Sequence, residues 1–309
     1  MSWVLVAIIA YFLVALEVIL DKFLLSSKRV SHPAIYAFYS GILSLTALFF
    51  VPFGFHGISW LRAVVSIFAG IIFVYGILNL FFAINKSQAS QVTPVVGAVI
   101  PLVTLFLSVF FLDERLKWLQ IWGIAALISG GLLISFNLPL KINKKKFFHG
   151  FYYSIAAGIF LALAFTWFKH FYEKDNFINV FVWTRIGLFA GAISLFAYPA
   201  WRRAISNSLG GFRKPQKENV KTGTLFVVNK GLGGIGSIMT NFAISLGSVT
   251  IVNALISTEY IFILFLGVIL SAWLPKVFRE KSDPLNIFQK VASIAIITAG
   301  VVLISFHRR

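Results

Sequence analysis

The chain has 309 residues, of which 59% are hydrophobic and only 12% are charged, and its formal net charge is +17. Soluble globular domains are about 45–50% apolar and about 25% charged, so this composition excludes an ordinary soluble enzyme. The 34 Phe residues exclude a disordered chain, because disordered chains lack apolar side chains to bury. We expect a polytopic membrane protein that contacts the lipid bilayer and not nucleic acid, with basic loops that set its topology.

Apolar segments of membrane-spanning length run through the whole chain. A helix needs about 20 apolar residues to cross the bilayer core. Ten segments between charged or turn-rich breaks meet this need, which predicts an all-α protein with ten transmembrane helices. The segments are Trp3–Leu20, Ala34–Val51, Ala63–Ile84, Val92–Leu112, Leu119–Phe136, Phe151–Phe168, Phe177–Ala197, Thr222–Leu246, Val249–Ala272 and Leu285–Phe306. The longest connection, Trp201–Lys221, is basic and polar, and we expect a loop there.

The two halves of the chain resemble each other weakly but in the same order. Gly131–Phe136 reads GLLISF and Val301–Phe306 reads VVLISF, and each stretch ends one half. We therefore predict two repeats of five helices each, residues 1–140 and residues 147–309. Because five is odd, equivalent helices must cross the membrane in opposite directions. Such inverted repeats are typical of secondary transporters, which bind substrate near the midplane.

A turn followed by a glycine-containing helix closes the first half. Asp113–Gln120 reads DERLKWLQ, and Gly123 and Ser129–Gly131 follow it. This turn and the ten-helix, two-repeat organisation resemble EamA-type transporters of the drug/metabolite transporter superfamily. The resemblance implies a multi-pass cell-membrane protein that exports a small metabolite by alternating access, and not an enzyme. The second half departs from the pattern, since Trp273–Pro284 is longer and lacks Glu-Arg-Leu; we interpret it as an interfacial insertion.

Four ionisable residues stand out inside the predicted spans: Glu17, Arg185, Lys230 and Glu259. Charges within a bilayer are costly and are therefore functional candidates. Their counterparts in the internal alignment are uncharged: Phe165 for Glu17, Tyr39 for Arg185, Gly70 for Lys230, and Ile100 or Pro101 for Glu259. This one-sidedness favours a substrate or proton role. The alternatives are that the charges neutralise each other as Glu17–Lys230 and Arg185–Glu259 pairs, or that Arg185 reaches toward the headgroups.

These charges suggest both a kind of substrate and a coupling ion. A site with both signs of charge suits a zwitterion such as an amino acid. Burial in a medium of low dielectric favours the protonated form of a carboxyl group, so we predict that Glu17 or Glu259 couples transport to protons. Tyr260 and Asn229 neighbour the charged positions and are further candidates for substrate contact. Packing and interhelical hydrogen bonding are the alternatives for these two residues.

A glycine-rich stretch in the eighth predicted span resembles a nucleotide-binding motif. Gly231–Gly236 satisfies G-x-G-x-x-G, but it lies inside an apolar segment without the βαβ context that a dinucleotide site requires. Close helix packing is the ordinary alternative. Because glycine weakens a helix, we predict that Gly231, Gly233 and Gly234 let this helix bend or unwind beside Lys230 as part of a gate.

Two prolines predict a second flexible point. Pro94 and Pro101 flank Gly97 in the fourth predicted span. Proline removes a backbone hydrogen bond and kinks a helix, so we expect this span to be bent. The matching places in the second half hold Ile251 and Thr258, so the bend need not serve both halves.

Catalytic and metal-binding motifs are missing from the sequence. There is no Cys, and the five His residues lie at or outside the ends of the predicted spans. We therefore expect no catalytic residues, no metal site and no cofactor. Two alternatives to a small-metabolite transporter stay open. One is a lipid-carrier or amphiphile flippase, as in small relatives of the superfamily, and the other is an intramembrane enzyme.

The loop charges give a prediction of orientation. The termini and the loops on their side of the membrane hold seven basic residues, and the other loops hold seventeen. Basic loops face the cytoplasm, so the tally predicts that both termini lie outside. The resemblance to EamA-type transporters implies the opposite orientation.

Overall fold

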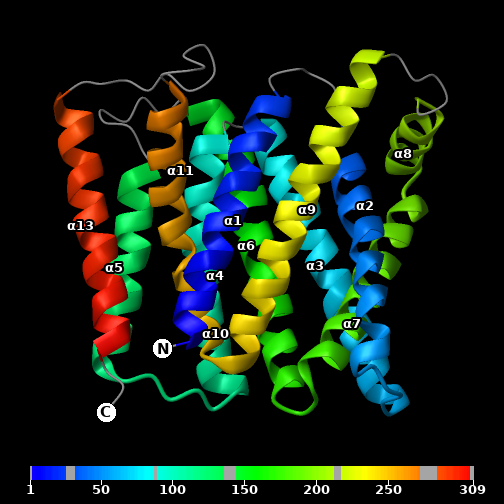
Figure 1. Ribbon diagram of the computed structural model, residues 1–309, viewed down its shortest axis with the longest axis horizontal. Coiled ribbons are helices and arrows are strands. Elements are labelled where there is room, and N and C mark those ends of the chain that lie inside the picture. The colour runs from blue at the N-terminus through cyan, green and yellow to red at the C-terminus, as the bar shows by residue number, and fades with distance from the viewer. Residues whose placement is uncertain are drawn as a thin grey trace. The chain divides into compact units, whose positions relative to one another are not determined.

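The computed structural model describes residues 2–25, 32–86, 89–135, 144–211, 217–271 and 284–306, and all its regular elements in these ranges are helices (Figure 1). The elements are α1 (Ser2–Leu25), α2 (Pro33–Leu43), the 3₁₀ helix η1 (Ser44–Phe53), α3 (Trp60–Lys86), α4 (Ala89–Phe111), α5 (Trp118–Ser135), α6 (Lys144–Tyr172), α7 (Phe177–Ser194), the 3₁₀ helix η2 (Leu195–Ala197), α8 (Pro199–Gly211), α9 (Lys217–Leu246), α10 (Val249–Ala254), α11 (Ile256–Ser271) and α13 (Pro284–Phe306). The predicted interfacial insertion after Ser271 lies outside the described residues.

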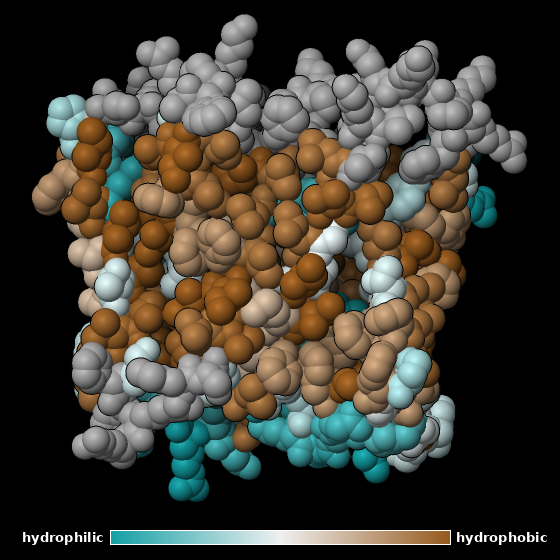
Figure 2. Space-filling view, viewed as in Figure 1, coloured by the Kyte–Doolittle hydropathy of each residue, from teal (hydrophilic) through white to brown (hydrophobic). Residues whose placement is uncertain are grey.

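Within the described ranges, nine helical segments are long and apolar enough to cross a membrane. Large apolar side chains such as Phe49, Phe106 and Phe288 are exposed on them, which suits contact with lipid tails. Figure 2 shows apolar side chains over the middle of the helices and hydrophilic ones gathered at helix ends. The eighth predicted span, Thr222–Leu246, is not among these nine; it lies in α9, a helix of 30 residues that is less apolar than they are and contains Asn229 and Lys230.

The helices group into two compact units, each drawn from both halves of the sequence. The first unit comprises Met1–Arg29, Glu114–Asn143 and Gln216–Arg309. In it, α1 packs against α9 and α11, and α5 packs against α13 and α11. The second unit comprises Val30–Asp113 and Lys144–Pro215. The two predicted sequence repeats remain a prediction, since this grouping concerns packing and not sequence similarity.

The second unit is built around α3, which packs against α6, α7 and α2, while α4 packs against α6. Two glycines let α3 and α7 approach closely. A Cβ atom at Gly70 would overlap the backbone at Thr184 and Gly187, and one at Gly187 would overlap the backbone of Ile67. Small residues at such crossings are a common way to pack helices in membranes.

The polar residues that begin the helices cap their free backbone groups. The Asn176 side chain accepts a hydrogen bond from the backbone N–H of Asn179 at the start of α7. The Ser248 hydroxyl accepts one from the backbone N–H of Ile251 at the start of α10. Each cap satisfies one of the N–H groups that a helix leaves unpaired at its first turn, so these side chains fix where the two spans begin.

The structure differs from the sequence predictions in two places. Part of the expected loop Trp201–Lys221 is helical, because Pro199–Gly211 forms α8. The predicted unwinding of the eighth span is not observed, since α9 is helical throughout Lys217–Leu246. The interruption lies in the next span, where Leu255 separates α10 from α11. The helix α4 is continuous through Pro94 and Pro101, and its bend stays a prediction.

Candidate functional site

An ion pair joins α1 to α9 in the first unit. The Lys230 ammonium donates a hydrogen bond to Glu17 Oε1 at 2.6 Å. The two side chains are 18% and 19% exposed, so the pair is largely but not wholly buried. The Glu17–Lys230 pair, which from the sequence is an alternative to a substrate or proton role, is thus present. Partial access matters, because a substrate or a proton can compete for one partner only if it can reach the pair.

Gly233 makes room for this ion pair. A Cβ atom on Gly233 would overlap the Glu17 carboxylate, and one on Gly236 would press against Val14 of α1. Gly231 and Gly234 have open space where a Cβ would lie. The glycine motif therefore has two faces. The face with Gly233 and Gly236 lets α1 and the Glu17 carboxylate lie close to α9. The role of the helix as part of a gate, with bending at Gly231, Gly233 and Gly234, stays a prediction.

Glu259 lies just beyond the interruption at Leu255, in the first turn of α11. It is only 7% exposed, and Glu17 and Tyr11 are close enough to interact with it electrostatically. No described residue of the first unit forms a hydrogen bond or an ion pair with the Glu259 carboxylate. The first unit therefore brings Glu17, Lys230 and Glu259 together, with Tyr260 buried beside Glu259 and Asn229 buried beside Lys230.

Hydrogen bonds to neighbouring helices hold the interrupted span in place. The Tyr11 hydroxyl donates to the backbone carbonyl of Val252 at 2.9 Å, three residues before the interruption. The Ser257 hydroxyl donates to the carbonyl of Leu127 in α5 at 2.6 Å. A Cβ on Gly131 would overlap that hydroxyl, so the glycine allows α5 to approach α11. These bonds anchor both sides of the break that precedes Glu259.

The turn that carries the family resemblance belongs to the first unit from Glu114 onward. Asp113 has a positive φ of 50°, a conformation that Asp adopts more readily than most residues. The Thr250 hydroxyl in α10 donates to Glu114 Oε2 at 3.0 Å. Gln120 Oε1 accepts from the backbone N–H of Lys117 at 2.9 Å and caps the start of α5. Glu114 thus links the turn to α10, and Gln120 caps the start of α5.

Arg185 lies on α7 in the second unit and is 6% exposed. Its guanidinium sits 4.4 Å from the centre of the Phe181 ring, a cation–π arrangement. Phe181 stacks in turn on Phe177, and Phe177 stacks on Tyr172. The guanidinium therefore contacts an aromatic stack and not an exposed surface. A pair between Arg185 and Glu259 would join the two units and stays a prediction, as does a substrate role for Arg185.

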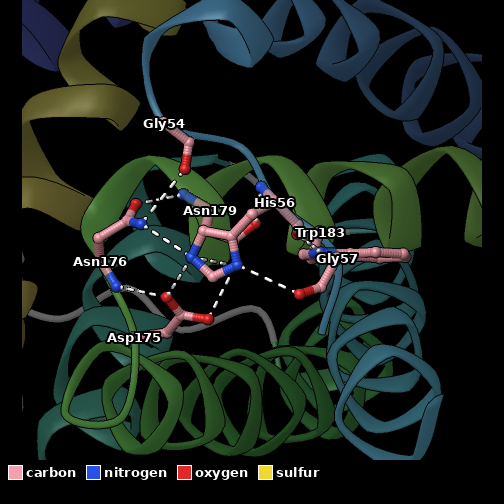
Figure 3. A network of polar contacts seen from close by, with 7 residues as sticks. All are labelled: Gly54, His56, Gly57, Asp175, Asn176, Asn179 and Trp183. Carbon is pink, nitrogen blue, oxygen red and sulfur yellow. Dashed lines mark hydrogen bonds and ion pairs between the residues drawn. The ribbon is translucent and has the colours of Figure 1, made fainter. Parts of the chain in front are cut away.

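A polar network in the second unit was not predicted from the sequence (Figure 3). His56 Nε2 lies 3.1 Å from Asp175 Oδ1, and the fully buried Asn179 donates to Asp175 Oδ2 at 2.7 Å. Asn176 donates to the Gly54 carbonyl at 3.2 Å. The network fastens the segment after η1 to the turn between α6 and α7. The Asp-Asn pair just before an apolar span is typical of a helix start and could have indicated one side of it.

Comparison with known proteins gives the family of the first part of the chain. The EamA-like transporter family matches residues 1–136, a range that ends just after α5. This match covers 136 of the 309 residues, somewhat less than half of the chain. The predicted resemblance is confirmed for this part of the chain. Together with the nine apolar spans of the described ranges, it identifies a multi-pass integral membrane protein.

Relatives of the chain include proteins named S-adenosylmethionine uptake transporter. The one from Rickettsia bellii (strain RML369-C) is 29% identical over 149 residues, and the one from Rickettsia prowazekii (strain Madrid E) is 28% identical over 149 residues. Each match covers 48% of this chain and 48% of the relative, so the chain matches about half the length of these relatives.

One solved crystal structure of a protein shares the fold of nearly the whole chain. It superposes with a TM-score of 0.70 and covers 99% of this chain and 98% of its own, at 14% sequence identity. This identity is low, so the match extends the fold beyond the EamA-like residues but does not carry function.

Proposed function

We propose that the chain is a secondary transporter that works by alternating access, with α9 as a tenth transmembrane span and with two inverted repeats of five helices. Repeated helix pairs support the repeat. In the first unit α1 packs against α9 and α11, and in the second unit α6 packs against α3 and α4. The internal alignment of the sequence equates α1 with α6, α9 with α3, and α11 with α4, so the same pairs recur.

The observation that carries the proposal is the Glu17–Lys230 ion pair, which lies inside the spans, is partly accessible and has Glu259 nearby. Two carboxylates and one ammonium give this group a net negative charge when both acids are ionised. Such a site favours a substrate that carries positive charge, and it favours a proton when the substrate is absent. We propose that substrate and proton compete for this group during the transport cycle.

We propose S-adenosylmethionine as the first substrate to test. Relatives that are 28% and 29% identical to part of the chain are named for its uptake. The molecule carries a sulfonium, an amino group and a carboxylate, so it combines a net positive charge with a zwitterionic end. That pattern suits a group of two acids and one base. The predicted direction, export, is not settled by these names, and the assay therefore measures both directions.

The experiment is transport of labelled S-adenosylmethionine by the full chain in proteoliposomes, with Glu17→Gln and Lys230→Met as test variants. We expect each to lower transport at least about tenfold, the equivalent of 1.4 kcal/mol. The matched control is the Lys169–Glu173 pair at the end of α6, with 3.5 Å between its charged atoms, changed to Met and Gln. Near-wild-type transport by both test variants would contradict the proposed site. If the wild type does not move this substrate, the substrate proposal fails.

A further inference from the structure

The helix α8 is amphipathic, and its buried face packs against the second unit beside α2. Ile205 is fully buried. The Ser208 hydroxyl lies 3.1 Å from the Tyr39 hydroxyl of α2, and the Trp201 ring lies 6.2 Å from the Phe82 ring of α3. These contacts hold α8 against the ends of two spans, so the orientation of its other face is fixed.

The opposite face of α8 is basic and polar. Arg202, Arg203, Ser206 and Asn207 are exposed on it. None of the ion pairs among the described residues involves either arginine. The surrounding segment, residues 201–221, contains six basic residues and one acidic residue. The two guanidinium groups are therefore available to an anionic partner.

Aromatic rings surround this basic face at the level where the spans end. The Tyr198 ring, 53% exposed, lies 4.7 Å from the Trp201 ring. Phe82 also contacts Tyr153 at 5.5 Å, and the Lys86 ammonium lies 4.4 Å from the centre of the Tyr153 ring. Tyr and Trp with adjacent Lys and Arg are typical of the membrane–water interface, where the rings lie among headgroups. This cluster thus places α8 at the headgroup layer.

We propose that the exposed face of α8 binds the headgroup of an anionic phospholipid, with Arg202 and Arg203 contacting its phosphate and the rings of Tyr198 and Trp201 lying beside it. Three observations support the assignment. The face is positive, its cations have no ion-pair partner among the described residues, and the aromatic cluster sets its depth. Planar guanidinium groups match the geometry of phosphate oxygens better than ammonium groups do.

The test measures lipid binding and not transport. Purified full-length protein in neutral detergent is titrated with dioleoyl phosphatidylglycerol or dioleoyl phosphatidylcholine, and retained lipid is counted by native mass spectrometry. Each basic residue near a membrane surface contributes about a fivefold gain in binding to anionic lipid, so Arg202→Gln/Arg203→Gln should weaken binding of phosphatidylglycerol about 25-fold. Binding of phosphatidylcholine should not change.

Two further variants make the result decisive. The matched control, Arg62→Gln/Arg115→Gln, removes two exposed arginines outside α8 and should leave binding of phosphatidylglycerol within about twofold of wild type, since surface charges act over about a Debye length. Arg202→Lys/Arg203→Lys keeps the charge and should retain most of the binding. The proposal is overturned if the Gln pair on α8 binds phosphatidylglycerol as the wild type does, or if the control loses binding equally.

Discussion

Glu17 and Lys230 occupy a helix contact that the second unit makes with aromatic rings. In the internal alignment Glu17 corresponds to Phe165, and α1 against α9 corresponds to α6 against α3. There the Phe165 ring lies 5.6 Å from Phe73 and 6.2 Å from Phe168. Replacing a buried ion pair by well-packed apolar residues is often neutral or stabilising. The equivalent helices α6 and α3 pack through an apolar contact. Packing alone therefore does not account for the ion pair between α1 and α9, and this favours a role of the pair in binding or coupling.

Proton coupling is tested at Glu259 and Glu17. We expect Glu259→Gln to abolish the response of transport to an imposed pH gradient while exchange of substrate across the membrane continues, because a neutral amide cannot take up or release a proton. Uptake into proteoliposomes with and without a pH gradient measures the first property, and counterflow measures the second. The control is Glu173→Gln, an acid outside the proposed site. If Glu17→Gln and Glu259→Gln both leave the pH response intact, proton coupling through these residues is wrong.

Gly233 gives a second test at the residue scale. Gly233→Ala should destabilise the folded protein by about 1–3 kcal/mol and lower transport, because the added methyl group overlaps the Glu17 carboxylate. Gly234→Ala, whose methyl group enters open space, should leave stability unchanged or raise it by up to about 1 kcal/mol through helix propensity. Thermal unfolding in detergent compares the two. If both substitutions changed stability equally, the contact with Glu17 would not explain why position 233 holds glycine.

At the scale of elements, hydropathy was enough to locate every predicted span as a helix, but not the places where helices stop. The span Val249–Ala272 contains no proline and only one glycine, Gly267, far from Leu255, so local sequence offers no reason for the interruption. The structure holds it through Tyr11 and Ser257, which bond to other helices. Contacts between distant segments are invisible to periodicity, and the location of the break could not be predicted.

The helix α8 was missed for a different reason. Its apolar face rests on few side chains, chiefly Trp201 and Ile205, within a segment dominated by basic and polar residues. Four ionisable candidates were found from the sequence because charge inside an apolar span is itself informative. Their grouping was only partly predictable. The Glu17–Lys230 pair followed from the rule that intramembrane charges pair, whereas the proximity of Glu259 to Glu17 depends on how α1 packs against both α9 and α11.

The hydrogen bond between Thr250 and Glu114 gives a test at the element scale. Thr250→Val should destabilise the protein by about 1.5–3 kcal/mol, because it removes a donor to a carboxylate and leaves the turn unattached to α10. In a double-mutant cycle with Glu114→Gln, the two effects should not add. Thr46→Val is the control, since the Thr46 hydroxyl is bonded only within its own turn and is exposed. Additive effects in the cycle would show that the motif acts through another contact.

At the scale of the whole molecule, the sequence predicts repeats by order along the chain, whereas the compact units group helices from both halves. In the first unit α1 and α5 belong to the first half, and α9, α10, α11 and α13 belong to the second. This interleaving brings Glu17, from one half, to Lys230 and Glu259, from the other. A site assembled in this way cannot be read from either half alone, which is why only the residues and not their arrangement were predictable.

The orientation of the chain is the last prediction. The basic helix α8 lies at the end of the second unit where α2 begins and α3 ends, and positive charge marks the cytoplasmic side. The chain has no Cys, so single cysteines report orientation without background. Asn207→Cys on α8 should react with a membrane-impermeant maleimide only in opened cells, and Gly57→Cys, before α3, should react in intact cells. The reverse labelling would place both termini inside, as the EamA resemblance implies, and would show that loop charge does not set the topology of this protein.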